Sequence, residues 1–212
     1  MRERLRVRVV LVAALWLGMW VAAHAADPSA GSLAQQALTE CETGRQSGNR
    51  AERVRCFERG KELAQRAVAL DDASASAHFA LFCNQGESMR LDGESLSDVI
   101  GLRSLIGELD RTLELDPNHP GALSAKGTLL IRLPRLLGGD VARGEAMLRR
   151  VLTLDPTAVT ARIGLARVCD WRGQRDESID YARHALQFAK ELGRADKVVE
   201  AQALLAELGE HY

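Results

Sequence analysis

The 212-residue sequence carries a formal net charge of −1, and 46% of its residues are hydrophobic while only 4% are aromatic. A near-neutral chain has no excess positive charge with which to attract a phosphate backbone, so its composition gives no reason to expect nucleic acid as a partner. The apolar residues are mostly Ala, Leu and Val with few strand-like alternations, which favours helix throughout.

The N-terminus differs in character from the rest of the chain. Four arginines (Arg2, Arg4, Arg6 and Arg8) precede an apolar run over residues 9–23, and Ala23-His24-Ala25 follows. This order predicts a secretory signal peptide at 1–25, a short leader at 26–31 and one exported, periplasmic domain at 32–210. A membrane-spanning helix needs roughly 20 apolar residues. The apolar run of 15 residues at 9–23 is short for a permanent anchor, so we expect cleavage and no membrane insertion afterwards. The alternative, a signal kept as an anchor, stays open.

Helical periodicity then continues to the C-terminus. The first predicted helix starts at Ser32 and ends in the loop 44–49, and the second stops at Asp71-Asp72. The third spans 74 to about 91, and a capping box at 95–98 opens the fourth, which stops at Asp116-Pro117. The fifth runs from Pro120 to near Pro134, and an apolar connection at 133–140 leads to Asp140 as N-cap of the sixth. The seventh and eighth flank a turn at 171–174, and the last helix spans 196 to about 208.

Equivalent positions in these helices repeat. The spacings from Asp72 to Pro117, Pro117 to Pro156 and Pro156 to Lys190 are 45, 39 and 34 residues, and 34 is the period of a tetratricopeptide repeat. Small residues recur at the close-packing positions of the second helices: Gly60, Ala64 and Ala67; Gly144, Leu148 and Val151; Ser178, Ala182 and Ala185. The chain from residue 32 therefore resembles a tetratricopeptide-repeat (TPR) protein. The resemblance implies an all-α solenoid of about four helical hairpins with a C-terminal capping helix. The connection at 133–140 also resembles one in exported TPR proteins, including the TPR subunit of TRAP-type periplasmic transporters.

The four cysteines would meet an oxidising compartment after export. Cys41 and Cys56 lie almost symmetrically about one loop, so a disulfide between them is one hypothesis, and two small buried residues are the other. Cys83 and Cys169 fall two repeats apart, and we expect both to be free.

The polar residues contain no signature of catalysis. The five histidines are scattered, and neither a His-Glu-x-x-His motif, a serine elbow nor a phosphate-binding glycine loop is present. We therefore expect no enzyme activity, no cofactor and no metal site.

The TPR resemblance implies a concave groove lined by the first helix of each hairpin. The repeat register places Phe79, Cys83 and Glu87 there from the second hairpin, Thr128 and Arg132 from the third, and Arg167, Asp170 and Trp171 from the fourth. We expect Phe79 and Trp171 to anchor a partner and the two arginines to bind a carboxylate. The alternative is that both rings only fill gaps between hairpins.

Two functions are compatible with this groove. The first is an exported scaffold that binds a protein or peptide segment, because a solenoid offers a long, shallow surface. The alternative, implied by the loop resemblance, is a ligand-binding accessory subunit of a TRAP-type solute transporter, for which an enclosed apolar pocket would be expected. The oligomeric state is left open by the sequence.

Overall fold

A computed structural model of the chain describes residues 29–91, 93 and 99–210, and within them it contains only helices and their connections. The α-helices are α2 (Ala30–Gln46), α3 (Arg50–Leu70), α4 (Ala75–Leu91), α5 (Val99–Leu115), α6 (Pro120–Arg132), α7 (Val141–Leu154), α8 (Val159–Trp171), α9 (Arg175–Glu191) and α10 (Ala195–Glu207). A short 3-10 helix, η1 (Arg135–Leu137), lies between α6 and α7. The predicted signal peptide and the predicted capping box at 95–98 lie outside the described residues.

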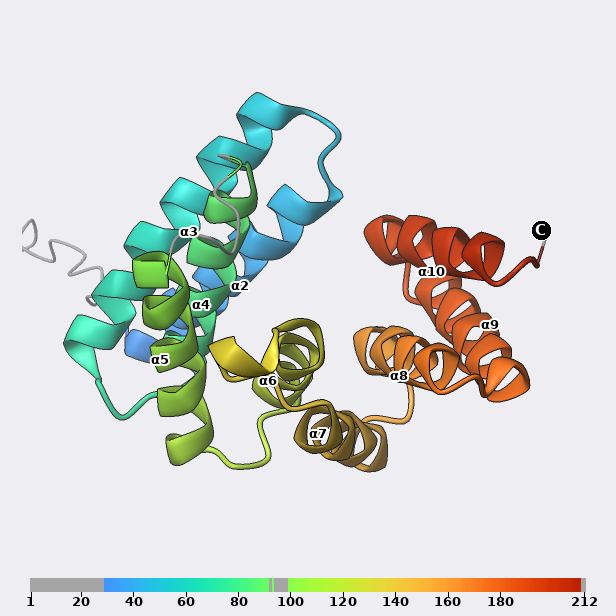
Figure 1. Cartoon of the computed structure of the whole chain (residues 1–212). Coiled ribbons are helices and arrows are strands. Elements are labelled where there is room, and N and C mark those ends of the chain that lie inside the picture. The colour runs from blue at the N-terminus through green and yellow to red at the C-terminus, as the bar shows by residue number, and fades with distance from the viewer. Residues whose placement is uncertain (1–28, 92, 94–98, 211–212) are drawn as a thin grey trace, which may run out of the picture.

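The helices pair into four antiparallel hairpins followed by α10 (Figure 1). The first helices α2, α4, α6 and α8 form an inner layer together with α10, and the second helices α3, α5, α7 and α9 form an outer layer. Each second helix also packs against the first helix of the next hairpin. This is the TPR-like α-solenoid that the sequence predicts, with α10 in the place of a fifth first helix.

Small residues allow the helices to approach closely. A Cβ atom added to Gly127 of α6 would lie 2.9 Å from the carbonyl oxygen of Gly144 in α7, so these helices touch backbone to backbone. A Cβ at Gly60 of α3 would lie 2.1 Å from the Oδ1 atom of the fully buried Asn84 in α4. The close-packing role predicted for Gly60 and Gly144 is therefore confirmed, since a side chain at either position would collide with the neighbouring helix.

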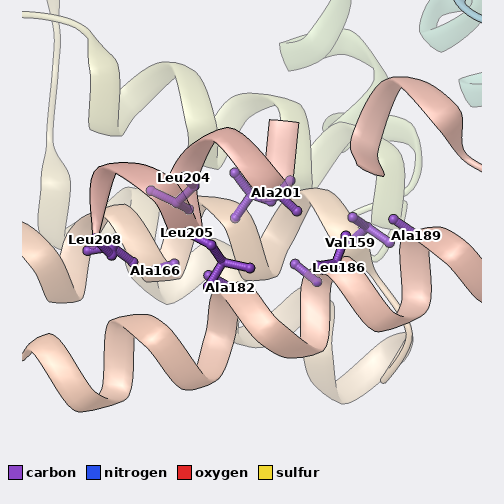
Figure 2. Close-up of a cluster of buried hydrophobic side chains, with 11 residues drawn as sticks. Val159, Ala166, Ala182, Leu186, Ala189, Ala201, Leu204, Leu205 and Leu208 are labelled. Atoms are coloured by element: carbon purple, nitrogen blue, oxygen red, sulfur yellow. The ribbon is translucent and has the colours of Figure 1, made fainter. Parts of the chain in front are cut away.

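The C-terminal helices share a continuous apolar core. Figure 2 shows side chains of α8, α9 and α10 meeting there, and its members include Val159, Ala166, Ala182, Leu186, Ala189, Ala201, Leu204, Leu205 and Leu208. Alanines predominate on α9, which keeps this helix close to both neighbours. The core fixes α10 against both α8 and α9.

Local sequence sets the helix ends. Ser29 caps α2, and its hydroxyl accepts a hydrogen bond from the Ser32 backbone N–H, so the helix begins at Ala30 inside the predicted leader. Asp140 caps α7 as predicted, with its carboxylate accepting from the Arg143 N–H at 3.0 Å. The connection before it bends at Gly138, whose φ of 88° is one that other residues rarely adopt.

Candidate partner-binding groove

A narrow cleft opens on the inner layer between α6, α8 and α10. Its lining consists of Thr128, Ile131, Arg132, Thr160, Ile163, Gly164, Arg167 and Glu200. Three of the eight residues predicted to line the groove, Thr128, Arg132 and Arg167, thus line one site. The two isoleucines are almost fully buried and form its apolar floor. The cleft volume is about 30 Å³, comparable to one water molecule.

The rim of the cleft is charged. The Arg167 guanidinium lies 3.7 Å from the Glu207 carboxylate of α10, and Lys197 donates a 2.7 Å hydrogen bond to Glu200. Arg132 is exposed at the end of α6 and has no ion pair or hydrogen bond within the part of the chain that the structure describes. A guanidinium without a partner beside an apolar floor is suited to a carboxylate.

Trp171 extends this surface along α8. It follows Arg167 by four residues, so the two side chains lie on the same helix face, and its side chain is 58% exposed. Asp170, one residue earlier, is also exposed at this end of the helix. The exposed ring agrees with the prediction of an aromatic residue available to a partner, and the gap-filling alternative does not hold for Trp171.

Phe79 and Glu87 do not reach the cleft. The Phe79 ring lies 4.5 Å from the His119 ring and directly over Gly121, where a Cβ would approach it to 2.4 Å. Phe79 therefore fills the gap between the second and third hairpins, which is the alternative interpretation stated above. Glu87 is 5% exposed and is held by ion pairs with Arg45 at 2.8 Å and Arg90 at 3.1 Å.

The disulfide pairing differs from the sequence hypothesis. Cys41 of α2 is bonded to Cys83 of α4, with their Cα atoms 6.3 Å apart, whereas Cys56 and Cys169 are free and buried. The predicted Cys41–Cys56 pair and the predicted free Cys83 are wrong, and the free Cys169 is confirmed. Cys41 and Cys56 are nearly level along their hairpin, but Cys41 points toward α4 while Cys56 lies against Glu40. Burial, followed by the nearby Glu40 charge, raises the pKa of the Cys56 thiol.

Sequence reasoning missed the other cleft residues. Thr160 and Gly164 precede Arg167 and Trp171 at i, i+4, i+7 and i+11, which is one stripe of α8. That periodicity could have identified them. Glu200 is not predicted by sequence reasoning, because it lies on the polar side of a helix expected only to cap the stack.

Among the described residues, no group of three or more His, Cys, Asp or Glu side chains is placed to hold a metal ion. None of the helices described has both the length and the apolar composition needed to span a bilayer.

Comparison with known proteins finds matches among solved structures. One crystal structure of MamA is 17% identical, with 80% of this chain and 84% of that chain covered and a TM-score of 0.48. A second crystal structure of MamA is 15% identical, with 78% of this chain and 96% of that chain covered and a TM-score of 0.42. No protein-family model matches the sequence, and no curated protein sequence matches it.

Proposed function

We propose that this protein is an exported, non-enzymatic scaffold that binds a protein segment across α6 and α8 of its inner layer. The observation that carries the proposal is the Arg132 guanidinium beside the cleft, which has no ion pair with any described residue and lies on a surface that continues to the exposed Trp171. In this proposal Arg132 and Arg167 bind a carboxylate of the partner and the Trp171 ring packs on an apolar side chain.

The dimensions of the cleft support a macromolecular partner. Pockets for drug-sized ligands enclose roughly 300–1,000 Å³, whereas this cleft holds about 30 Å³. A shallow surface suits a peptide or helix that contributes one or two side chains. A cleft of this size does not support the alternative, an accessory subunit of a TRAP-type solute transporter with an enclosed ligand.

The Cys41–Cys83 disulfide supports the export part of the proposal. Structural disulfides persist in oxidising compartments and are rare where thiols are kept reduced. Together with the signal-like segment at residues 1–25, this bond favours the periplasm as the place of action.

Site-specific photocrosslinking in the native compartment tests the proposal. A photoreactive residue replaces Thr160 inside the cleft, and the matched control carries it at Arg66 on the exposed side of α3. We expect one dominant protein captured from position 160 and not from position 66. Arg132→Ala and Trp171→Ala each weaken capture about fivefold or more, the effect expected of an interface residue that contributes about 1 kcal/mol or more.

A matched apolar truncation provides the second control. Leu192→Ala removes a side chain that is 55% exposed, close to the 58% of Trp171, but lies outside the cleft at the end of α9. Capture by this variant should equal that of the wild type. Absence of any captured protein, together with a small molecule retained in native mass spectrometry, would reject the scaffold in favour of the accessory alternative.

A further inference from the structure

The inner layer is interrupted between α4 and α6. Helices α2 and α4 pack side by side, as do α6 and α8, but α4 and α6 have no comparable packing among the described residues. The buried members of the apolar clusters follow the same division, with three clusters in α2–α4 and two in α6–α10, and the partly buried Leu113 of α5 packs against one of the latter. We therefore divide the stack into two lobes, α2–α5 and α6–α10, whose order along the chain can be followed in Figure 1.

One side of the lobe boundary carries a small junction. Phe79 of α4 packs on His119 and Gly121 at the start of α6, and Lys126 of α6 forms an ion pair with Asp110 of α5. The chain itself crosses between the lobes once, at residues 116–119. A short connection with few packed side chains is the kind of segment that accommodates a change of angle between two rigid bodies.

An ion pair crosses the other side of the boundary. The Nε of Arg194, at the start of α10, lies 3.0 Å from the Glu42 carboxylate near the end of α2. The two side chains come from the first and last helices of the solenoid, so this contact joins its ends. Both are partly exposed, at 28% for Arg194 and 35% for Glu42.

Each partner of this ion pair also has a contact within its own lobe. Glu42 accepts a 2.9 Å hydrogen bond from the Gln46 amide, and Arg194 lies 3.3 Å from the Asp196 carboxylate. After separation of the lobes, Arg194 would keep an ion pair with Asp196, and Glu42 would keep the hydrogen bond from the Gln46 amide. An exposed ion pair with substitutes on both sides contributes little free energy and exchanges readily with water and salt.

We propose that the protein is a hinged clamp, in which the two lobes turn about residues 116–119 and the Glu42–Arg194 ion pair latches their free ends together. In the closed form, α2 and α10 are in contact, so the inner layer, which carries the cleft beside Arg132, is closed at its two ends. The open form admits a partner from the side between α2 and α10. This inference concerns the motion of the chain alone, and it holds whether or not the cleft binds a protein segment.

Single-molecule energy transfer measures the opening directly on the signal-free chain. Fluorophores on non-natural amino acids at Thr39 of α2 and Gln202 of α10, both exposed, report the separation of the free ends. We expect Glu42→Gln to raise the ratio of open to closed molecules roughly two- to fivefold, the range of an exposed ion pair. Glu42→Arg should open the clamp further, and Glu42→Arg combined with Arg194→Glu should return it toward the wild-type ratio.

The control removes a different ion pair from the same helix. Glu40→Gln breaks the 2.7 Å pair between Glu40 and Arg59, which joins α2 to α3 inside one lobe, and should leave the ratio unchanged. Raising the salt concentration to 1 M should open the wild type but not Glu42→Gln, because only the wild type has a latch to screen. Equal ratios in the wild type and all Glu42 variants would overturn the proposal, as would equal opening by Glu40→Gln. Circular dichroism establishes that each variant keeps its helices.

Discussion

Reduction of the Cys41–Cys83 disulfide should destabilise the protein by a predictable amount. The bond joins residues 42 positions apart in the sequence. In the chain-entropy model, closing a loop of this size lowers the entropy of the unfolded chain enough to stabilise the fold by about 4 kcal/mol at 25 °C. Domains of this size are typically stable by roughly 5–15 kcal/mol, so the bond is a large fraction of the total.

Urea unfolding with and without a phosphine reductant measures this contribution. With a urea dependence of roughly 1–3 kcal/mol per molar, a loss of about 4 kcal/mol moves the midpoint down by roughly 1–4 M. Peptide mapping of the non-reduced protein should recover Cys41 linked to Cys83 and free thiols at Cys56 and Cys169. The Cys56→Ala variant is the control, because its response to the reductant should equal that of the wild type.

Two results would refute this reasoning. A reductant effect below about 1 kcal/mol would mean that the unfolded chain is not constrained by the bond as the entropy model requires. A recovered Cys41–Cys56 peptide would mean that the two cysteines of the first hairpin face each other, contrary to the packing of α2 against α4.

Three further predictions concern stability. Gly60→Ala should lower the free energy of unfolding, measured by chemical denaturation, by about 1–3 kcal/mol, because its Cβ would lie 2.1 Å from a buried side-chain oxygen of α4. Gly107→Ala is the control: a Cβ there meets nothing within 4 Å, so this variant should raise the free energy of unfolding by up to about 1 kcal/mol. Burial lowers the pKa of His119 below its ordinary 6.5. The neutral side chain therefore contributes to the free energy of unfolding above pH 6.5, and this contribution is lost as the pH falls through the folded-state pKa. His119→Asn should remove this part of the pH dependence of the melting temperature. Hydrogen bonds, chiefly from Arg172, lower the pKa of Glu145 below 4.5. A second loss of stability, measured as a fall in melting temperature, should therefore begin as the pH falls below 4.5, and it should be smaller in Arg172→Gln.

The helices were predictable because their ends are encoded locally. Asp140 caps α7 as expected, and the turn predicted at 171–174 differs from the structure only in that α8 includes Trp171. Caps, prolines and apolar periodicity act over a few residues, so one sequence suffices to read them. The start of α2 at Ala30 departs from the prediction by two residues, since Ser29 supplies a cap within the expected leader.

The pairing of Cys41 with Cys83 depends on the register between repeats. Arg45 and Glu87, one helical turn beyond the two cysteines, also pair, and both pairs are 42 residues apart. The spacing of 45 between helix ends gave a different register because it includes residues of the connection between α4 and α5. Two side-chain pairs with one common offset mark parallel neighbouring helices, and a search for that offset would have found the disulfide.

The same register explains why Glu87 is not a groove residue. A residue that aligns with its counterpart on the next first helix points along the layer, into the seam between α2 and α4, and becomes buried there. The cleft residues Thr128 and Arg167 instead lie where α6, α8 and α10 meet. Sequence periodicity gives the face of a helix, but the angle between consecutive hairpins decides whether that face meets a neighbour or opens to a partner.

The last helix caps the stack as the sequence predicts, and it also takes part in two other contacts. It places Leu204 and Leu205 against the core and Glu200 beside the cleft, and Arg194 at its start contacts the N-terminal lobe. Its position therefore connects the binding surface with the contact between the lobes. Because Glu207 of α10 already lies 3.7 Å from Arg167, a partner carboxylate must compete with Glu207 for that arginine, and an exposed ion pair of this length exchanges readily. Partner binding and lobe opening then depend on the same helix, so a partner that displaces Glu207 should also change the fraction of open molecules.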